Sequence, residues 1–393
     1  MRRSLRFAPS FALLLALLSG CAAPDLLAER RTWWRTPNHA LLVDDLRPLE
    51  RVRGRGGTAL PAGDPVLAQA LQDAALEAIG PHRTAALLVW HGEALQLAYH
   101  GPGFDAAMLS APASMPKPVL ALAVGAAVDR GLLDIDAPVS RHLPEWRADP
   151  RGRITVRQAL QMRSGLAKHG PASAGGAGEA LMLGTRLADL VLATPLVRAP
   201  GEAFDYNNID NALVALVLER ATRTRYADWL SATIWQPIGA GEAFVWLDRP
   251  GGLARTFCCL LATPQDWVRI GRLVKDGGQW NGQPVLSAGW MAAMTAPSPG
   301  NDAYGFQLWR GTVAAARSYG SGAAPPLPVG APYAVDDLLV FDGAGGQRVY
   351  ISRKADLVIV RIGEDVPDWQ DSRLPNAVIK VLRAPSRTPR SPR

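Results

Sequence analysis

The chain has 393 residues, of which 48% are hydrophobic and 20% are charged. This length and apolar content are typical of a globular protein with a sizeable core, in one large domain or two to three ordinary ones. Gly and Pro are frequent, at 38 and 32 residues, but their share stays below that of low-complexity disordered chains. The chain shows no repeat and has only three Cys, which excludes a collagen, a coiled coil and a small disulfide scaffold.

The net charge of +7 comes mainly from Arg, since only five of the 42 basic residues are Lys. The Arg residues are scattered among Ala, Gly and Pro, and no run of five or six like charges occurs. A nucleic-acid-binding surface would concentrate basic residues on one face or in one stripe. The sequence therefore argues against a nucleic-acid partner.

Residues 1–20 are predicted to be a lipoprotein signal peptide. Three Arg precede an apolar run at 11–18, which is too short to span a bilayer but suits the core of a signal peptide. The run leads into Leu-Ser-Gly-Cys, ending at Cys21, which resembles a bacterial lipobox with lipid attached to that Cys. The next residue is Ala rather than Asp, which in the usual Gram-negative sorting pattern favours the outer membrane. We therefore expect an exported protein, lipid-anchored in the cell envelope and facing the periplasm.

Residues 21–64 are predicted to link this anchor to the folded domain, either as a tether or as an arm that wraps around it. Residues 65–79 combine strong helix formers with apolar residues at helical spacing, so we expect a helix there. The folded domain is expected to span residues 65–383. Residues 384–393 read as a disordered tail.

Strand patterns lie near both ends of this domain, and helical patterns fill its middle. The predicted strands form two hairpins, at residues 84–90, 94–99, 347–352 and 357–362. Residues 119–273 read mostly as helix, broken by Pro and Gly loops. We therefore predict an α+β fold, with one antiparallel sheet built from both ends of the domain and a mostly helical subdomain inserted at about 126–265.

Two local segments carry predictions of their own. Residues 168–184 are rich in Gly and Ala and read as a loop, which is a candidate for a mobile lid. Cys258 and Cys259 are neighbours, whereas ordinary disulfides join Cα atoms roughly 4.4–6.8 Å apart. We therefore predict that both act as buried small apolar residues, and without His nearby they do not form a metal site.

The segment from Ser114 to Lys117, Ser-Met-Pro-Lys, opens an apolar helical stretch. Residues three apart share one face of a helix, so the Lys amine can reach the Ser hydroxyl. The helix N-terminus favours a developing alkoxide, and a desolvated Lys falls in pKa and can act as a base. On its own this spacing is common, and a Ser that caps a helix beside a Lys on the surface would show the same sequence pattern.

Two further segments contain candidate site residues. Tyr206, Asn207 and Asn208 lie just before an apolar helix, where a Tyr can face a cleft and either Asn can cap the helix. Residues 341–347, Phe-Asp-Gly-Ala-Gly-Gly-Gln, lead into a strand. Glycines there let the backbone approach a ligand, and an exposed backbone N–H can hold an oxyanion. A tight turn without any ligand would account for the same Gly-rich sequence.

In this order, the three segments resemble the motifs of the serine β-lactamase and penicillin-binding-protein superfamily. Four stretches between them resemble the same family, at residues 131–139, 142–145, 154–160 and 163–166. Residues 258–271 and the Gly-Gly-Gln at 345–347 resemble its class C-like branch, which includes 6-aminohexanoate-dimer hydrolases and esterases. The resemblance covers roughly residues 65–383, and it remains a motif match.

The resemblance implies acyl transfer without a metal or cofactor. Ser114 would attack a carbonyl, Lys117 would take its proton, and Tyr206 would pass that proton to the leaving group before water hydrolyses the acyl-enzyme. The backbone N–H groups of Ser114 and Ala344 would form the oxyanion hole. Asn208 would orient Lys117 or the substrate. The residues assigned to the substrate and the oxyanion are Asn208, Gly343, Ala344 and Gly345.

The sequence departs from the family pattern at two places. Phe341 and Asp342 stand where β-lactam-recognising members carry a Lys or His that helps to hold the substrate carboxylate, which favours esters or small linear amides. Pro116 and Pro118 flank Lys117. Pro is tolerated in the first helical turn, but Pro118 strains the bond back to residue 114 if the helix starts there. We therefore expect the helix start to shift or tighten.

Three functions follow from these observations. The leading hypothesis is a lipid-anchored serine hydrolase that acts on a small ester or amide. The second is a non-catalytic envelope protein that keeps the fold, suggested by the missing cation and the two prolines. The third is a peptidoglycan-editing D,D-peptidase, suggested by the expected location. The six His show no metal-ligand spacing, and no Gly-x-Ser-x-Gly nucleophile motif occurs.

Overall fold

The computed structural model describes residues 26–80, 83–171, 175–311, 316–320, 326–366 and 368–384. The predicted signal peptide, Cys21 and the tail beyond residue 384 lie outside the described residues. In the part of the chain that is described, no helix is both long enough and apolar enough to cross a membrane.

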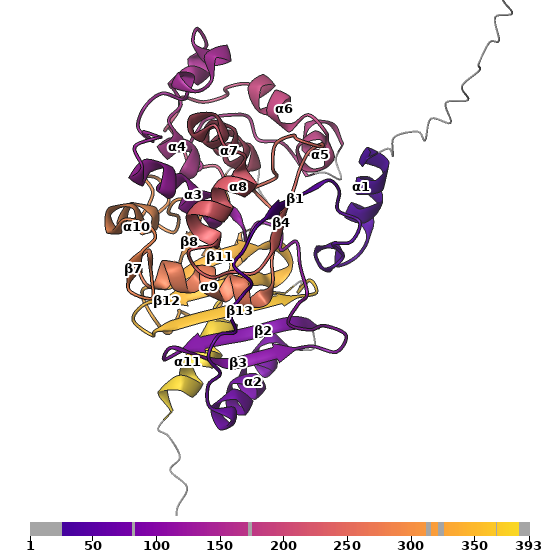
Figure 1. The fold of residues 1–393 in the computed structure, drawn as a ribbon, viewed down its shortest axis with the longest axis vertical. Helices are drawn as coiled ribbons and strands as arrows, with labels where there is room; N and C mark the ends of the chain where they lie inside the picture. The colour runs from indigo at the N-terminus through magenta and orange to yellow at the C-terminus, as the bar shows by residue number, and fades with distance from the viewer. Residues whose placement is uncertain are drawn as a thin grey trace, which may run out of the picture.

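A six-stranded antiparallel sheet runs through the lower half of the molecule in the order β3-β2-β13-β12-β11-β8 (Figure 1). Its strands are β2 (Thr84–His91), β3 (Ala94–His100), β8 (Trp309–Arg310), β11 (Leu339–Gly343), β12 (Gln347–Ser352) and β13 (Leu357–Gly363). β2 and β13 pair antiparallel along their length, with His91 opposite Leu357 and Ala86 opposite Ile362. The N-terminal and C-terminal segments therefore share one sheet, and the predicted hairpins and α+β class are confirmed.

Helices cover both faces of this sheet. α2 (Pro65–Ile79) and α11 (Arg373–Arg383) pack on one face, and α9 (Pro264–Lys275) packs on the other. β13 is buried along its whole length because its side chains alternate between the two cores, with Ile359 on the α2 side and Val358 on the α9 side. α2 spans the predicted residues 65–79, and Asp64 is its N-cap, with a carboxylate that accepts the Val66 N–H at 2.8 Å.

The upper half of the molecule is mostly helical and contains a small three-stranded sheet (Figure 1). Its helices are α3 (Lys117–Asp129), α4 (Val156–Leu160), α5 (Gly176–Leu183), α6 (Leu187–Ala193), α7 (Asn208–Thr222), α8 (Tyr226–Leu230) and α10 (Ala288–Thr295). The small sheet joins β1 (Leu49–Val52), β4 (Ala243–Trp246) and β5 (Leu260–Leu261), and short pairs are formed by β6 (Gln279–Trp280) with β7 (Gln283–Pro284) and by β9 (Ala316–Arg317) with β10 (Leu327–Pro328). Single-turn helices lie at His39–Leu41, Val139–Arg141, Pro144–Trp146, Pro150–Arg153, Ser231–Trp235 and Ala344–Gly346.

The segment before residue 65 is packed against the body from residue 26 onward. In α1 (Leu26–Arg35), Arg30 and Trp33 are buried, and the Arg30 guanidinium donates to the carbonyls of Leu183 at 2.8 Å and Leu247 at 3.1 Å. β1 then pairs antiparallel with β4. Of the two forms expected for this segment, the described part has that of a wrapping arm rather than a free tether.

The prediction of a loop at residues 168–184 is wrong for the second half of this segment, because Gly176–Leu183 form helix α5. Leu181 and Leu183 on this helix are buried, and Glu179 pairs with Arg31 of α1 at 2.7 Å. A short Gly-rich helix has little stability of its own, so its partners in α1 and α6 stabilise it. α1 is distant from this helix in sequence, so its contacts could not be seen in the local composition that predicted a loop.

The prediction of two unlinked Cys is also wrong, because Cys258 and Cys259 form a disulfide with each other. Their N–H groups both donate to the Arg255 carbonyl, at 3.3 and 3.1 Å, so the chain turns tightly at this point. The Cα spacing of ordinary disulfides, on which the prediction rested, does not describe bridges between neighbours.

Candidate active site

Ser114 lies in a turn directly before α3, which starts at Lys117 with Pro116 as its N-cap. The Lys117 N–H donates to the Ser114 carbonyl at 3.2 Å, and the Val119 N–H donates to the Pro116 carbonyl at 2.9 Å. The helix start has therefore both shifted and tightened, as the prolines predicted. Ala113, just before Ser114, has a left-handed φ of 49°, a strained conformation that is common at functional sites.

The amine of Lys117 is aimed at the hydroxyl of Ser114. Lys117 Nζ lies 2.8 Å from Ser114 Oγ and donates to the Phe257 carbonyl at 2.9 Å. The residue is only 1% exposed, and this burial lowers its pKa to about 7, against the opposing charge of Asp342. Near neutral pH a large fraction of the amine is therefore uncharged and able to accept the Ser114 proton.

Tyr206 completes a group of three side chains. Lys117 Nζ lies 4.9 Å from the centre of the Tyr206 ring, and the phenol hydrogen-bonds to Ser114. Burial raises the pKa of Tyr206, while the bond to Ser114 opposes this shift, so the phenol stays protonated. Its ring stacks on Trp309 at 5.8 Å, and its N–H donates to the Tyr319 carbonyl at 3.0 Å. The structure thus brings together the three residues predicted to be catalytic.

Asn207 and Asn208 take different roles. Asn207 caps α7 by accepting the Ile209 N–H at 3.2 Å, which resolves the choice between the two. Among the described residues, the buried side-chain oxygen of Asn208 has no hydrogen-bond partner, and no contact of Asn208 with Lys117 is seen. Lys117 Nζ donates instead to the backbone carbonyl of Phe257, and the role of Asn208 toward the substrate stays a prediction. Sequence reasoning missed Phe257, because a backbone carbonyl leaves no signal in the residue type.

The end of β11 lies against the segment that contains Ser114. A Cβ on Gly343 would come within 2.2 Å of the Pro112 carbonyl and 3.3 Å of the Met115 Cβ, so only glycine permits this approach. Ala344 follows in a tight turn, and Gly345 in that turn has a φ of 76°. Gly343 thus lies against the segment that contains Ser114, and the oxyanion role of Ala344 and Gly345 stays a prediction.

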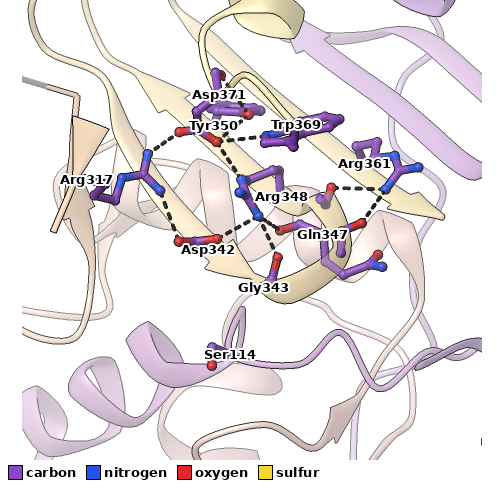
Figure 2. A network of polar contacts seen from close by, with 12 residues as sticks. Ser114, Arg317, Asp342, Gly343, Gln347, Arg348, Tyr350, Arg361, Trp369 and Asp371 are labelled. Carbon is purple, nitrogen blue, oxygen red and sulfur yellow. Dashed lines mark hydrogen bonds and ion pairs between the residues drawn. The ribbon is translucent and has the colours of Figure 1, made fainter. Parts of the chain in front are cut away.

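A closed ring of four buried charges stands behind this strand end (Figure 2). Asp342 pairs with Arg317 at 3.1 Å and with Arg348 at 2.6 Å, and Asp371 pairs with Arg348 at 2.7 Å and also with Arg317. Arg348 further donates to the Gly343 carbonyl at 2.5 Å. Figure 2 shows Gly343 between this network and Ser114. The network, whose formal charges cancel, therefore anchors the strand end of the candidate oxyanion hole.

This network includes Asp342, which stands where β-lactam-recognising members of the family carry a Lys or His. The carboxylate of Asp342 accepts the Tyr319 hydroxyl at 2.7 Å besides its two Arg partners. Arg317 and Arg348 are each only 2% exposed at the side chain, and both are committed to ion pairs. Sequence reasoning missed Arg317 and Asp371, because their role is set by contacts between distant segments. Within the described ranges, no three His, Cys, Asp or Glu gather as a metal site, and metal-free chemistry stays a prediction.

The fold and this Ser–Lys–Tyr group define a protein of the serine β-lactamase-like class. A family model described as Beta-lactamase matches residues 73–380. The chain therefore belongs to the beta-lactamase family, as its motifs suggested.

Individual relatives agree with this assignment. The chain is 28% identical to the 6-aminohexanoate-dimer hydrolase of Paenarthrobacter ureafaciens over 226 residues, which cover 54% of this chain and 57% of that protein. It is 38% identical to Esterase EstB of Burkholderia gladioli over 141 residues, covering 32% and 36%. A Bacillus anthracis structure, provisionally described as a 6-aminohexanoate-dimer hydrolase, superposes with a TM-score of 0.68 at 18% identity and covers 91% of this chain and 93% of its own. The match thus spans just over half the length of the first curated relative and about a third of the second.

Proposed function

We propose that this protein is a serine hydrolase that cleaves ester or small linear amide bonds through an acyl-enzyme on Ser114. The observation that carries the proposal is the 2.8 Å contact between Lys117 Nζ and Ser114 Oγ, made by a buried amine whose pKa is lowered to about 7. A non-catalytic role was suggested in part by Pro116 and Pro118. This geometry removes that argument, since the amine reaches the hydroxyl despite both prolines.

In the proposed cycle, the neutral Lys117 amine takes the proton of Ser114 as Oγ bonds to the substrate carbonyl carbon. The backbone N–H groups of Ser114 and Ala344 hold the resulting oxyanion. The tetrahedral intermediate then collapses and breaks the C–O or C–N bond. Tyr206 gives its phenolic proton to the leaving group and regains one from the Lys117 ammonium. Water repeats the sequence on the acyl-enzyme, which releases the acid and restores the free Ser114.

The substrate class follows from what surrounds Ser114. Arg317 and Arg348, which lie beside the end of β11, are both paired with Asp342 and Asp371. Among the described residues, neither of these two cations is therefore free to bind a substrate carboxylate. Next to Ser114, the Tyr206 ring is packed against the aromatic rings of Trp309 and Tyr319. These features support an uncharged acyl group, and they argue against a β-lactam or a D-Ala-D-Ala peptide. One relative is named as a 6-aminohexanoate-dimer hydrolase and another as an esterase, and both names support an ester or small linear amide as the substrate.

The proposal predicts a substrate order. Purified enzyme is expected to hydrolyse short-chain p-nitrophenyl esters, then linear amides, with little turnover of nitrocefin. A fluorophosphonate probe is expected to label Ser114, and Ser114→Ala is expected to lose both label and turnover. Lack of ester turnover and of labelling in folded enzyme would contradict the proposed function. Nitrocefin turnover above ester turnover would contradict the proposed substrate class.

We also propose that the protein is a lipoprotein of the outer membrane, anchored through Cys21 and facing the periplasm. The Arg-rich start, the apolar run and the lipobox-like Leu-Ser-Gly-Cys support this location. The Cys258–Cys259 disulfide adds support, because disulfides persist mainly in oxidising compartments such as the periplasm.

This location predicts a change in membrane attachment. Wild-type protein expressed in a Gram-negative host is expected in the outer-membrane fraction, and Cys21→Ala is expected to lose lipid labelling and leave that fraction. If wild type and Cys21→Ala were found in the outer-membrane fraction in equal amounts, the proposed lipid anchor at Cys21 would be contradicted. Cys258→Ala is the matched control, since it removes a Cys outside the lipobox and is expected to stay with the membrane.

A further inference from the structure

A disulfide between neighbouring residues lies directly beside the proposed catalytic group. The carbonyl of Phe257 accepts a hydrogen bond from Lys117 Nζ at 2.9 Å, and the Cys258–Cys259 disulfide begins at the very next residue. Both Cys are buried, at 5% and 2% exposure. The ring closed by the two sulfurs therefore restricts the backbone immediately after the carbonyl that contacts Lys117.

The turn that contains this ring is held at several points. The N–H groups of Cys258 and Cys259 donate to the Arg255 carbonyl, and the Cys259 carbonyl accepts the Trp246 N–H at 3.0 Å. On the other side of Phe257, the Thr256 hydroxyl contacts the Asn211 side chain at 2.5 Å. The Phe257 carbonyl thus lies between two fixed positions, one held by a side-chain hydrogen bond and the other by the disulfide.

We propose that the Cys258–Cys259 disulfide positions the general base, by fixing the Phe257 carbonyl where it directs Lys117 Nζ toward Ser114 Oγ. The inference rests on the proposed function. A lysine chain is long and flexible, so its amine needs a second partner to stay in one orientation. Among the described residues, the Phe257 carbonyl is the one backbone acceptor that contacts this amine. Loosening the turn would leave the amine buried but no longer aimed.

The effect acts through geometry and not through new charge. The groups whose charge or ring faces the Lys117 amine are Asp342 on β11 and Tyr206 before α7. Arg255, on the turn itself, directs its guanidinium to the carbonyls of Met182, Leu247 and Gly184. Reduction converts the disulfide into two uncharged thiols, so none of these charges changes. The carbonyl hydrogen bond favours the ammonium form, and its loss should lower the pKa of Lys117 further.

The test compares the oxidised mature enzyme with Cys258→Ser/Cys259→Ser on a p-nitrophenyl ester. The oxidised enzyme is expected to show an acid limb of kcat/KM near pH 7, because Lys117 must be neutral to take the proton. In the variant, kcat is expected to fall about tenfold, the cost of one misaligned hydrogen bond, with KM nearly unchanged and the acid limb at lower pH. Reducing wild type with a phosphine is expected to give the same change, reversed on reoxidation and absent in the variant.

The outcomes separate this inference from the proposed function. Unchanged kcat and an unchanged acid limb in an active, disulfide-free enzyme would overturn the role of the disulfide alone. Free thiols at both Cys in the exported protein, shown by mass spectrometry, would overturn it too. If the double variant fails to fold, the comparison of oxidised and reduced wild type decides. Absence of Ser114-dependent hydrolysis in the oxidised enzyme would overturn the proposed function itself.

Discussion

Replacing Lys117 by Met is expected to lower kcat/KM for ester hydrolysis by about 10⁴-fold, the upper range for loss of a general base. Met keeps the length and apolar stem of Lys but removes the amine that contacts Ser114 Oγ at 2.8 Å. Because Lys117 is buried and its pKa is already lowered by burial, an apolar side chain fits this position. The variant is therefore expected to fold and to be at least as stable as wild type. Steady-state kinetics with a thermal melt measure both effects.

The matched control is Ser114→Ala, alone and together with Lys117→Met. Residues that act as one unit are strongly non-additive, so the double variant should be no slower than the slower single variant. A double variant whose loss equals the product of both single losses would mean that the two residues act independently. Residual turnover of Lys117→Met within tenfold of wild type would show that another group deprotonates Ser114.

The sequence predicted those parts of the site that depend on local pattern or on ordered motifs. The helix at residues 65–79 has its capping Asp64 and apolar spacing in the sequence itself. The strands near both ends alternate strongly enough to predict the sheet. Ser114, Lys117 and Tyr206 were identified because the hydroxyl, amine and phenol that the reaction needs are fixed by residue type, and because their motifs occur in the order typical of the family. The structure brings these three residues into contact.

The parts that could not be predicted depend on contacts between distant segments. The Phe257 carbonyl contacts Lys117 across 140 positions, and any residue type could supply it. Arg317 and Asp371 meet across 54 positions, and either looks in the sequence like an ordinary surface charge. Helix α5 is Gly-rich and is stabilised by elements whose positions become known only in the fold. Sequence patterns report local propensity, whereas these features are set by tertiary packing.

The four-charge network places Asp371 between two guanidinium groups with almost no access to water. Arg348 and Arg317 both pair with it, and Tyr350 and Trp369 also donate to its carboxylate. Burial alone would raise the pKa of Asp371, but the charges of Arg317 and Arg348 outweigh it and hold the pKa below its ordinary range. Stability from a carboxyl of lowered pKa is present above its unfolded value, about 3.9, and is lost only as the pH falls through the folded value.

Asp371→Asn is therefore expected to lower the free energy of unfolding by about 3–5 kcal/mol, because it leaves two buried Arg with a single carboxylate, that of Asp342. The loss should be the same at pH 5 and pH 7, since Asp371 is ionised at both. Denaturant unfolding of the mature chain measures it. Adding Arg317→Met to this variant restores charge balance between Arg348 and Asp342, and it is expected to recover part of the stability.

The exposed pair of Lys354 and Asp336 provides the contrast, because it joins the same charge types in water. Asp336→Asn is expected to leave unfolding unchanged within error, since exposed ion pairs contribute little. Because Arg348 also holds the Gly343 carbonyl, Asp371→Asn should lower kcat more than it changes KM. If Asp371→Asn were as stable as Asp336→Asn, the network would not stabilise the fold. If adding Arg317→Met to Asp371→Asn lowered the free energy of unfolding by as much as Arg317→Met does alone, the two charges would not be coupled. In the first case, the end of β11 would owe its position to packing at Gly343 and not to the charges behind it.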